Sequence, residues 1–163
     1  MTHASVSTRT IAVDHITITS TRPFAEVRRK LEAKVPKLDV SIADALRTGD
    51  QARVADYDRN GPKLSIFVQR DHGALLQIAG RPRNAVQYEI GNPSTASKMT
   101  RHRLAAGLYA PLRVVLFEDE HGGAVFEYDK PSSFFGQYGD EQVAKVGRYL
   151  DATLEAILRD AAE

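Results

Sequence analysis

A chain of 163 residues has the usual size of one domain and is long enough to bury a single core. Hydrophobic residues make up 42% of the chain and charged residues 26%, a balance that excludes a disordered chain. The formal net charge of +1 provides no overall field for nucleic acid or anionic lipid, so both are disfavoured as partners. Because the chain has no Cys, disulfides, thiolate zinc sites and cysteine nucleophiles are excluded.

The N-terminal residues lack the apolar core of a signal peptide, and no later segment approaches the roughly 20 apolar residues that span a bilayer. We therefore expect a cytoplasmic protein that has no membrane partner. No internal repeat or linker-like break divides the chain, which predicts a single domain over residues 1–163. Residues 1–9 are expected to be flexible.

The first third of the chain predicts a strand, a helix and a variable helical insertion. Residues 10–19 are rich in β-branched types and predict a strand, although its apolar phase changes near His15, which indicates a bulge or burial on both faces. Helical spacing from Pro23 ends at Pro36, with apolar positions Phe24, Val27, Leu31 and Val35. Residues 37–61 predict a short helix followed by a mobile, Asp-rich connection.

The middle of the chain alternates strands with capped helices. Apolar residues at every second position predict one strand from Lys63 and another around Tyr88. Between them, Asp71 is placed to cap a short helix that runs to Ala79. After the second strand, Asn92 is placed to cap a helix that starts at Pro93 and runs to about His102.

The last third predicts a hairpin followed by a long helix. Residues 112–116 and 125–128 alternate as two strands joined by the turn at 121–123, and Asp140 caps a helix after the loop PSSFFGQYG. Gly147 within this helix is explained by close packing on the sheet. The helix has an apolar stripe that consists of Val143, Val146, Leu150, Leu154, Ile157 and Ala161.

Charge repulsion decides between two registers of the hairpin. A two-residue loop at 122–123 places Glu118 opposite Glu127, and like charges directly opposed are destabilising. A three-residue loop at 121–123 with a left-handed Gly places Leu116 opposite Tyr128 and Glu118 opposite Phe126. The three-residue loop is therefore predicted.

The strand pattern predicts an α+β fold in which one face of an antiparallel sheet is covered by helices. Nine side chains are expected to turn toward the helices: Leu64, Ile66, Val68, Val86, Tyr88, Ile90, Leu112, Val114 and Leu116. The opposite face has too many apolar groups for a solvated surface, namely Phe67, Val115, Phe117 and Val125. Either residues 37–61 or a second subunit is expected to cover it, and we expect a homodimer.

From about Asp71 onward the sequence resembles the DUF302 family, whose function is unknown. The resemblance lies in DHGALLQIAGRPRNAVQYEIGNP, STASKMTRH and LYAPLRVVLFEDEHGGAVFEYDKPSS, and it covers about half of the chain. Its most specific parts are the Gly91-Asn92-Pro93 turn with Met99 and the Pro-Leu-Arg strand that ends at Glu118-Asp119. The resemblance implies a TATA-binding-protein-like fold, β-α-β-β-β-β-α, with helices on one face of the sheet. It supplies no catalytic residues, and the fold alone does not imply DNA binding.

Two candidate sites lie around the helix that starts at Pro93. Free N–H groups at its start are suited to a phosphate or carboxylate, although Pro93 removes one donor and Asn92 satisfies another simply by capping. At its end, Arg101 and His102 lie near Tyr109 in sequence. Cations there are explained by the helix dipole, yet His102 has a reference pKa suited to acid–base chemistry.

Glu118 is the third candidate because it falls on the apolar phase of its strand. An unpaired carboxylate is costly to bury, so Glu118 either reaches water at the strand end or faces a cavity with Tyr88 and Tyr128. In such a cavity its pKa would rise into a catalytically useful range.

The remaining motifs point away from several enzyme classes. His72, His102 and His121 are isolated, and HExxH, GxSxG, GxGxxG and GxxxxGK[ST] are missing, so no metal and no cofactor is expected. The leading hypothesis is a dimeric small-molecule-binding module with its ligand between sheet and helices, at Asn92, Arg101, Tyr109, Glu118, Tyr128 and Tyr88. The alternatives are a cofactor-independent enzyme using His102 or Glu118 as general acid or base, and a structural or partner-binding protein.

Overall fold

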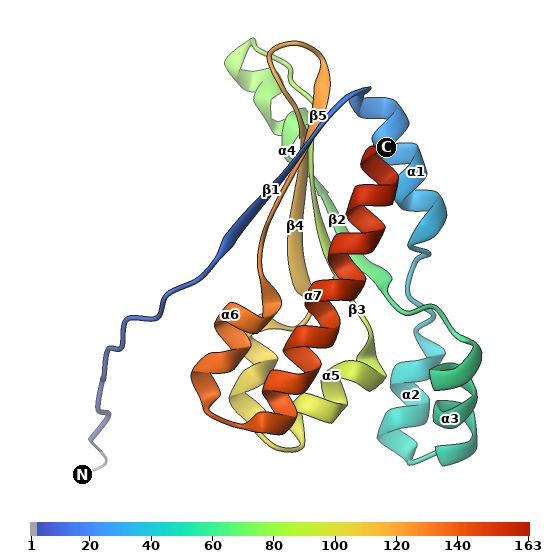
Figure 1. Ribbon diagram of the computed structural model, residues 1–163, viewed down its shortest axis with the longest axis vertical. Helices are drawn as coiled ribbons and strands as arrows, with labels where there is room; N and C mark the ends of the chain where they lie inside the picture. The colour runs from blue at the N-terminus through green and yellow to red at the C-terminus, as the bar shows by residue number, and fades with distance from the viewer. Residues whose placement is uncertain (1–2) are drawn as a thin grey trace.

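The computed structural model describes residues 3–163, and Figure 1 shows how their helices and strands are arranged. In chain order the elements are β1 (His15–Pro23), α1 (Phe24–Lys34), α2 (Ser41–Thr48), α3 (Gln51–Asn60), β2 (Ser65–Asp71), α4 (His72–Leu75), the 3-10 helix η1 (Leu76–Ala79), β3 (Ala85–Gly91), α5 (Pro93–Thr100), η2 (Leu104–Tyr109), β4 (Leu112–Glu118), β5 (Gly123–Asp129), α6 (Pro131–Phe135), η3 (Gly136–Tyr138) and α7 (Glu141–Ala162).

The strands form one antiparallel sheet in the order β1-β5-β4-β3-β2. Helices α1 and α7 contact each other and pack on the same side of this sheet (Figure 1). The predicted α+β fold is thus confirmed, with its β-α-β-β-β-β-α order and short extra helices. The predicted caps also form: Asp71, Asn92 and Asp140 accept hydrogen bonds from the first turns of α4, α5 and α7.

A bulge in β2 turns one of the nine side chains that were predicted to face the helices to the other side of the sheet. Eight of the nine side chains are buried, but Val68 is 37% exposed. Ile66 pairs with Ile90 whereas Val68 pairs with Glu89, so Phe67 is an extra residue and every later side chain changes face. Gln69 takes the inward position that Val68 was expected to occupy.

The hairpin between β4 and β5 has a three-residue turn with a left-handed glycine, but its register differs from the prediction. Leu116 pairs with Phe126 and Glu118 with Ala124, two residues from the predicted partners. The Asp119 carboxylate accepts hydrogen bonds from the N–H groups of His121 and Gly123, both at 2.8 Å, and these bonds lower the pKa of Asp119. They close the turn one residue earlier than predicted, over residues 120–122, where Gly122 has φ +83°.

Two segments near the N-terminus fold differently from the prediction. The first strand begins at His15 instead of Thr10, and it turns Ile16 and Ile18 inward. Residues 37–61 form the two helices α2 and α3, not one helix and a mobile connection, because Asp50 accepts a hydrogen bond from the N–H of Arg53 and caps α3. These helices lie beside α5 at one end of the sheet, so they do not cover its opposite face (Figure 1).

The residues 1–9 that were expected to be flexible are described only from His3, because Met1 and Thr2 lie outside the described residues. Within the described part, the Arg9 guanidinium donates a hydrogen bond of 2.7 Å to the side-chain oxygen of Gln137.

Gly147 is needed for contact between helices and not for contact with the sheet. A Cβ at this position would lie 3.1 Å from Cα of Ser132 and 3.4 Å from Cβ of Phe135, both in α6. The loop predicted at PSSFFGQYG is this short helix followed by η3. The close approach of α6 to α7 completes the layer of helices beside η2 and α5.

Candidate functional site

The structure separates Glu118 from the two tyrosines that were expected to share a cavity with it. Val114 pairs with Tyr88 on one side and with Tyr128 on the other, whereas Glu118 lies at the far end of β4, by the hairpin. Its carboxylate accepts a hydrogen bond of 2.7 Å from the side-chain amide of Asn84. The expected cavity that Glu118 would share with Tyr88 and Tyr128 is therefore not formed, because Glu118 lies four residues from Val114 along β4 and bonds to Asn84.

The tyrosine hydroxyls have other neighbours. Tyr88 donates to the Glu32 carboxylate of α1 at 2.9 Å, and burial raises the pKa of Tyr88. Burial, together with the nearby carboxylates Glu155 and Asp151, raises the pKa of Tyr128 to about 12. Both phenols therefore remain protonated at neutral pH and belong to the packed interior.

The side chain of Tyr109 also packs against neighbouring parts of the fold. Its ring packs on Phe134 with centroids 4.7 Å apart, and its hydroxyl accepts a hydrogen bond of 3.2 Å from the side-chain amide of Gln137. These contacts attach η2 to α6 and η3.

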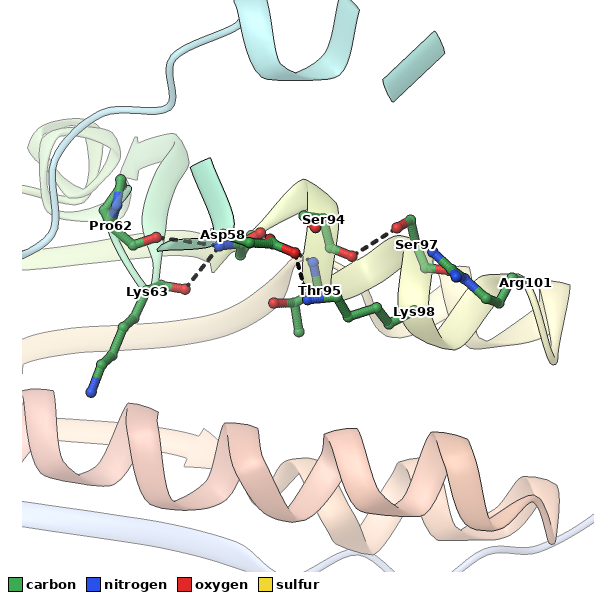
Figure 2. A network of polar contacts seen from close by, with 9 residues as sticks. Asp58, Pro62, Lys63, Ser94, Thr95, Ser97, Lys98 and Arg101 are labelled. Carbon is green, nitrogen blue, oxygen red and sulfur yellow. Dashed lines mark hydrogen bonds and ion pairs between the residues drawn. The ribbon is translucent and has the colours of Figure 1, made fainter. Parts of the chain in front are cut away.

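Three of the predicted residues do meet in one place. Asn92, Arg101 and His102 line a cleft of about 700 Å³ between the end of α3, the connection 61–63, α5 and α7. The polar contacts along its α5 wall are drawn in Figure 2. Five cationic residues from all sides of the cleft line it, namely Arg59, Lys63, Lys98, Arg101 and Lys145.

Asn92 builds the cleft and leaves no side-chain atom for a ligand. Its Oδ1 accepts the N–H of Thr95 at 3.1 Å, and its Nδ2 donates to the carbonyls of Pro62 and Lys63, each at 3.2 Å. Figure 2 shows these two carbonyls facing the start of α5. The predicted capping role is confirmed, and the same side chain attaches the connection 61–63 to α5.

One cation of the cleft is already neutralised. Lys98 forms an ion pair of 2.9 Å with Asp58, the only carboxylate among the residues that line the cleft. Burial alone would raise the pKa of Asp58, but hydrogen bonds from Ser94 and Lys98 outweigh it and lower the pKa. Asp58 is therefore charged at neutral pH and fixes Lys98.

The other four cations have no such partner. Within residues 3–163, Arg59, Lys63, Arg101 and Lys145 take part in no ion pair, and Arg101 donates only to the backbone carbonyl of Ser97, at 3.1 Å. A small anion entering the cleft would meet these cations without having to displace a carboxylate. The excess of positive charge is confined to the cleft, since the whole chain has a formal charge of only +1.

Sequence reasoning identified Arg101 and His102 but missed Arg59, Lys63, Lys98 and Lys145. Lys98 and Arg101 are three residues apart, a spacing that places both on one side of a helix and was available as a signal. Arg59 and Lys63 could not be assigned to the site from the sequence, because residues 51–60 were not recognised as a helix.

A smaller, apolar pocket of about 80 Å³ adjoins the cleft on the inner side of α5, between the sheet and helices α5, α6 and α7. The two cavities share Asn92 and Thr95. The structure thus presents a charged cleft next to an apolar pocket.

Comparison with known proteins places the chain in a family. The family model described as "Domain of unknown function DUF302" matches residues 58–161. The chain belongs to the DUF302 family. The match begins near the end of α3, so α2 and most of α3 precede it.

A solved DUF302 structure has the same fold. It is the crystal structure of an uncharacterized conserved DUF302 protein from Bacillus stearothermophilus, with a TM-score of 0.65 and 18% identity. The alignment covers 91% of this chain and 98% of that one. No curated protein matches this chain.

Two classes of feature are missing from the part of the DUF302 chain that the structure describes. None of its helices is long and apolar enough to cross a membrane. Residues 3–163 also contain no group of three or more His, Asp or Glu side chains placed to hold a metal ion.

Proposed function

We propose that this DUF302 protein is a binding module for a small anionic molecule, held in the cleft between α3, α5 and α7. The observation that supports this proposal is a cleft of about 700 Å³ lined by four cations that have no ion-pair partner within residues 3–163. Phosphate and carboxylate groups form charge-assisted hydrogen bonds with such side chains, and an arginine binds them in a bidentate manner.

The cations have a physical reason to bind an anion. Side chains of like charge that share one cleft repel each other, and the low-dielectric walls reduce their screening by water. A bound anion removes this repulsion and replaces part of the lost hydration. Binding should therefore weaken as ionic strength rises.

Titration with inorganic phosphate at low ionic strength, followed by amide NMR, tests the proposal. We expect the signals of α5 and of the α7 residues around Lys145 to shift, and Arg101→Gln and Lys145→Gln each to weaken binding about tenfold. The matched control is Arg29→Gln, which removes an exposed arginine of α1 and changes the net charge equally. Equal weakening by Arg29→Gln, or no saturable shift in the wild type, would contradict a specific site.

The placement of the acid–base candidates supports binding over catalysis. His102 is exposed at the rim of the cleft, and Glu118 lies at the opposite end of the sheet, bonded to Asn84. The two candidates therefore cannot act on one substrate, and each would have to serve alone as general acid or base.

We also propose that the chain forms a homodimer through the open face of the sheet. Val115 and Phe117 of β4 are only half-buried on this face, where the charged Arg113 lies on the same strand and Asp129 lies on the neighbouring β5. A two-fold axis parallel to the strands, between β4 and β5, would place Arg113 of one copy over Asp129 of the other. The same axis would place Phe117 of one copy over Val125 of the other.

Sedimentation of charge-reversed variants tests the dimer. Arg113→Asp and Asp129→Arg should each shift the protein toward monomer, because like charges then oppose each other across the interface. The double variant restores opposite charges and should recover the dimer. A wild-type monomer at micromolar concentration, or a double variant no better than the single ones, would contradict this interface.

A further inference from the structure

The apolar pocket beside α5 differs chemically from the cleft that it adjoins. Its wall consists mainly of hydrocarbon from strand ends and helices, including Phe67, Met99, Leu112, Phe135 and Leu150. The polar side chains in its lining are Asn92 and Thr95, the two residues that it shares with the cleft. The boundary between the polar cleft and the apolar pocket therefore lies at these two residues.

Thr95 is the free polar group at this boundary. The side chain of Asn92 is fully used by its cap and by the carbonyls of Pro62 and Lys63. For the Thr95 hydroxyl, by contrast, the described part of the chain provides no hydrogen-bond partner, although the residue is only 9% exposed. A ligand that passes from the cleft into the pocket would meet this hydroxyl.

We propose that the cleft takes an amphipathic anion whose charged head lies near Arg101 and Lys145 and whose short apolar part enters the pocket beside α5. This inference rests on the anion site proposed above and adds the chemical class of the ligand. The lining offers water few partners, so hydrocarbon is the better occupant. Its volume of about 80 Å³ is roughly half that of a cavity that holds benzene, which limits the apolar part to roughly three carbons.

A homologous series of ligands measures this pocket directly. The series consists of inorganic phosphate and the methyl, ethyl, propyl, butyl and pentyl phosphates, which share one head group. Affinity should rise about fourfold per added carbon until the pocket is full, at roughly three carbons, and then level off. An affinity that does not change along the series would overturn the proposal.

Ala96→Leu tests the location of the apolar part. Ala96 lines the apolar pocket but not the cleft, so leucine should occupy the space that the alkyl chain would take. The measured quantity is the ratio of the Kd for inorganic phosphate to that for propyl phosphate, which should fall toward one. The matched control Ala152→Leu, on the exposed side of α7, should keep the wild-type ratio.

The outcomes separate this inference from the proposed function. If phosphate binds, and Arg101→Gln weakens it, but chain length has no effect, the anion site stands and the amphipathic ligand is refuted. If Ala96→Leu keeps the wild-type ratio, the alkyl group binds elsewhere and the proposal fails. If no phosphate or alkyl phosphate binds, both proposals fail. Should Ala96→Leu not fold, the wild-type series alone decides.

Discussion

Two buried tyrosines of this protein differ in whether their hydroxyl groups are satisfied. Tyr88 donates to Glu32 at 2.9 Å, whereas the hydroxyl of Tyr57 is buried and has no partner within residues 3–163. An unsatisfied buried hydroxyl costs free energy, but a hydrogen bond to a charged group stabilises the fold.

The same Tyr→Phe change should therefore have opposite effects at the two positions. We expect Tyr88→Phe to lower the free energy of unfolding by about 1 kcal/mol, because Glu32 loses a donor. Tyr57→Phe should raise it by about 1 kcal/mol, because no bond is lost and desolvation becomes easier. Urea unfolding at neutral pH measures both, with exposed Tyr149→Phe as the control. Destabilisation by Tyr57→Phe would show that its hydroxyl has an unrecognised partner.

Glu32 gives the fold a defined dependence on pH. Burial alone would raise its pKa, but hydrogen bonds from Arg28 and Tyr88 at 2.9 Å and from Gln69 at 3.0 Å outweigh it and lower the pKa. A lowered carboxyl pKa stabilises the folded state above the unfolded value of about 4.3, and the contribution is lost as the pH falls through the folded pKa.

The loss of that contribution is measurable in Glu32→Gln. We expect this variant to be less stable than the wild type at neutral pH and the difference to shrink as the solution is acidified below about pH 4. Unfolding free energies across this pH range test the expectation. The control is Glu120→Gln, which removes an exposed carboxylate with no ion pair in the described chain. A difference that grows on acidification would reverse the assigned sign.

At the scale of elements, α6 and α7 approach so closely at Gly147 that even a Cβ there would lie 3.1 Å from Cα of Ser132. The nearest atoms to a Cβ at Gly147 belong to the backbone of Ser132 and to Phe135, so a larger side chain must push the helices apart. Gly147→Leu should lower the free energy of unfolding by about 1–3 kcal/mol despite its better helix propensity. Ala152→Leu on the exposed side of α7 should stay within about 0.5 kcal/mol of the wild type. Equal stabilities of the two variants would contradict close packing as the reason for the glycine.

Local chemistry made some elements predictable and long-range pairing made others unpredictable. The caps at Asp71, Asn92 and Asp140 follow from neighbouring residues, and all three form. The bulge at Phe67 does not follow, because only pairing with β3 determines where β2 gains a residue. The hairpin register depended on two hydrogen bonds to Asp119, and alternation of apolar residues does not detect such bonds.

The candidate site was predictable on one wall only. Asn92, Arg101 and His102 are close in sequence to one capped helix, so a single segment identified them. The opposite walls come from α3 and α7, and bringing Lys145 and Arg59 to the same cleft requires the tertiary fold. For Glu118 the parity of its strand was correct, but parity gives no position along the strand, and Glu118 lies beside the hairpin, bonded to Asn84 and apart from Tyr88 and Tyr128.

At the scale of the whole molecule, the buried side chains form two clusters of unequal size. The main core joins the sheet to α1, α5, α6 and α7, whereas α2 and α3 enclose a small separate cluster. The small cluster consists of Ile42, Ala45 and Tyr57, with Leu38, Leu46 and Val54 packed against it. This helical pair largely precedes the DUF302 match, and its α3 supplies one wall of the charged cleft.

Two clusters of this kind predict two levels of native-state hydrogen exchange. Amides of α2 and α3 should exchange through an opening that costs less free energy than the opening of β3 and β4, because fewer apolar contacts are broken. Ile42→Val and Ile90→Val form a matched pair, since both isoleucines are fully buried, one in each cluster.

These two Ile→Val variants distinguish a local opening from global unfolding. Ile90→Val should lower the opening free energy of β3 and β4 by about 1 kcal/mol and leave that of α2 and α3 unchanged, because the local opening keeps the main core intact. Ile42→Val should lower both, because global unfolding includes the small cluster. If both variants shift every amide equally, the molecule opens as one unit. In that case the wall of the cleft formed by α3 would be as rigid as the sheet.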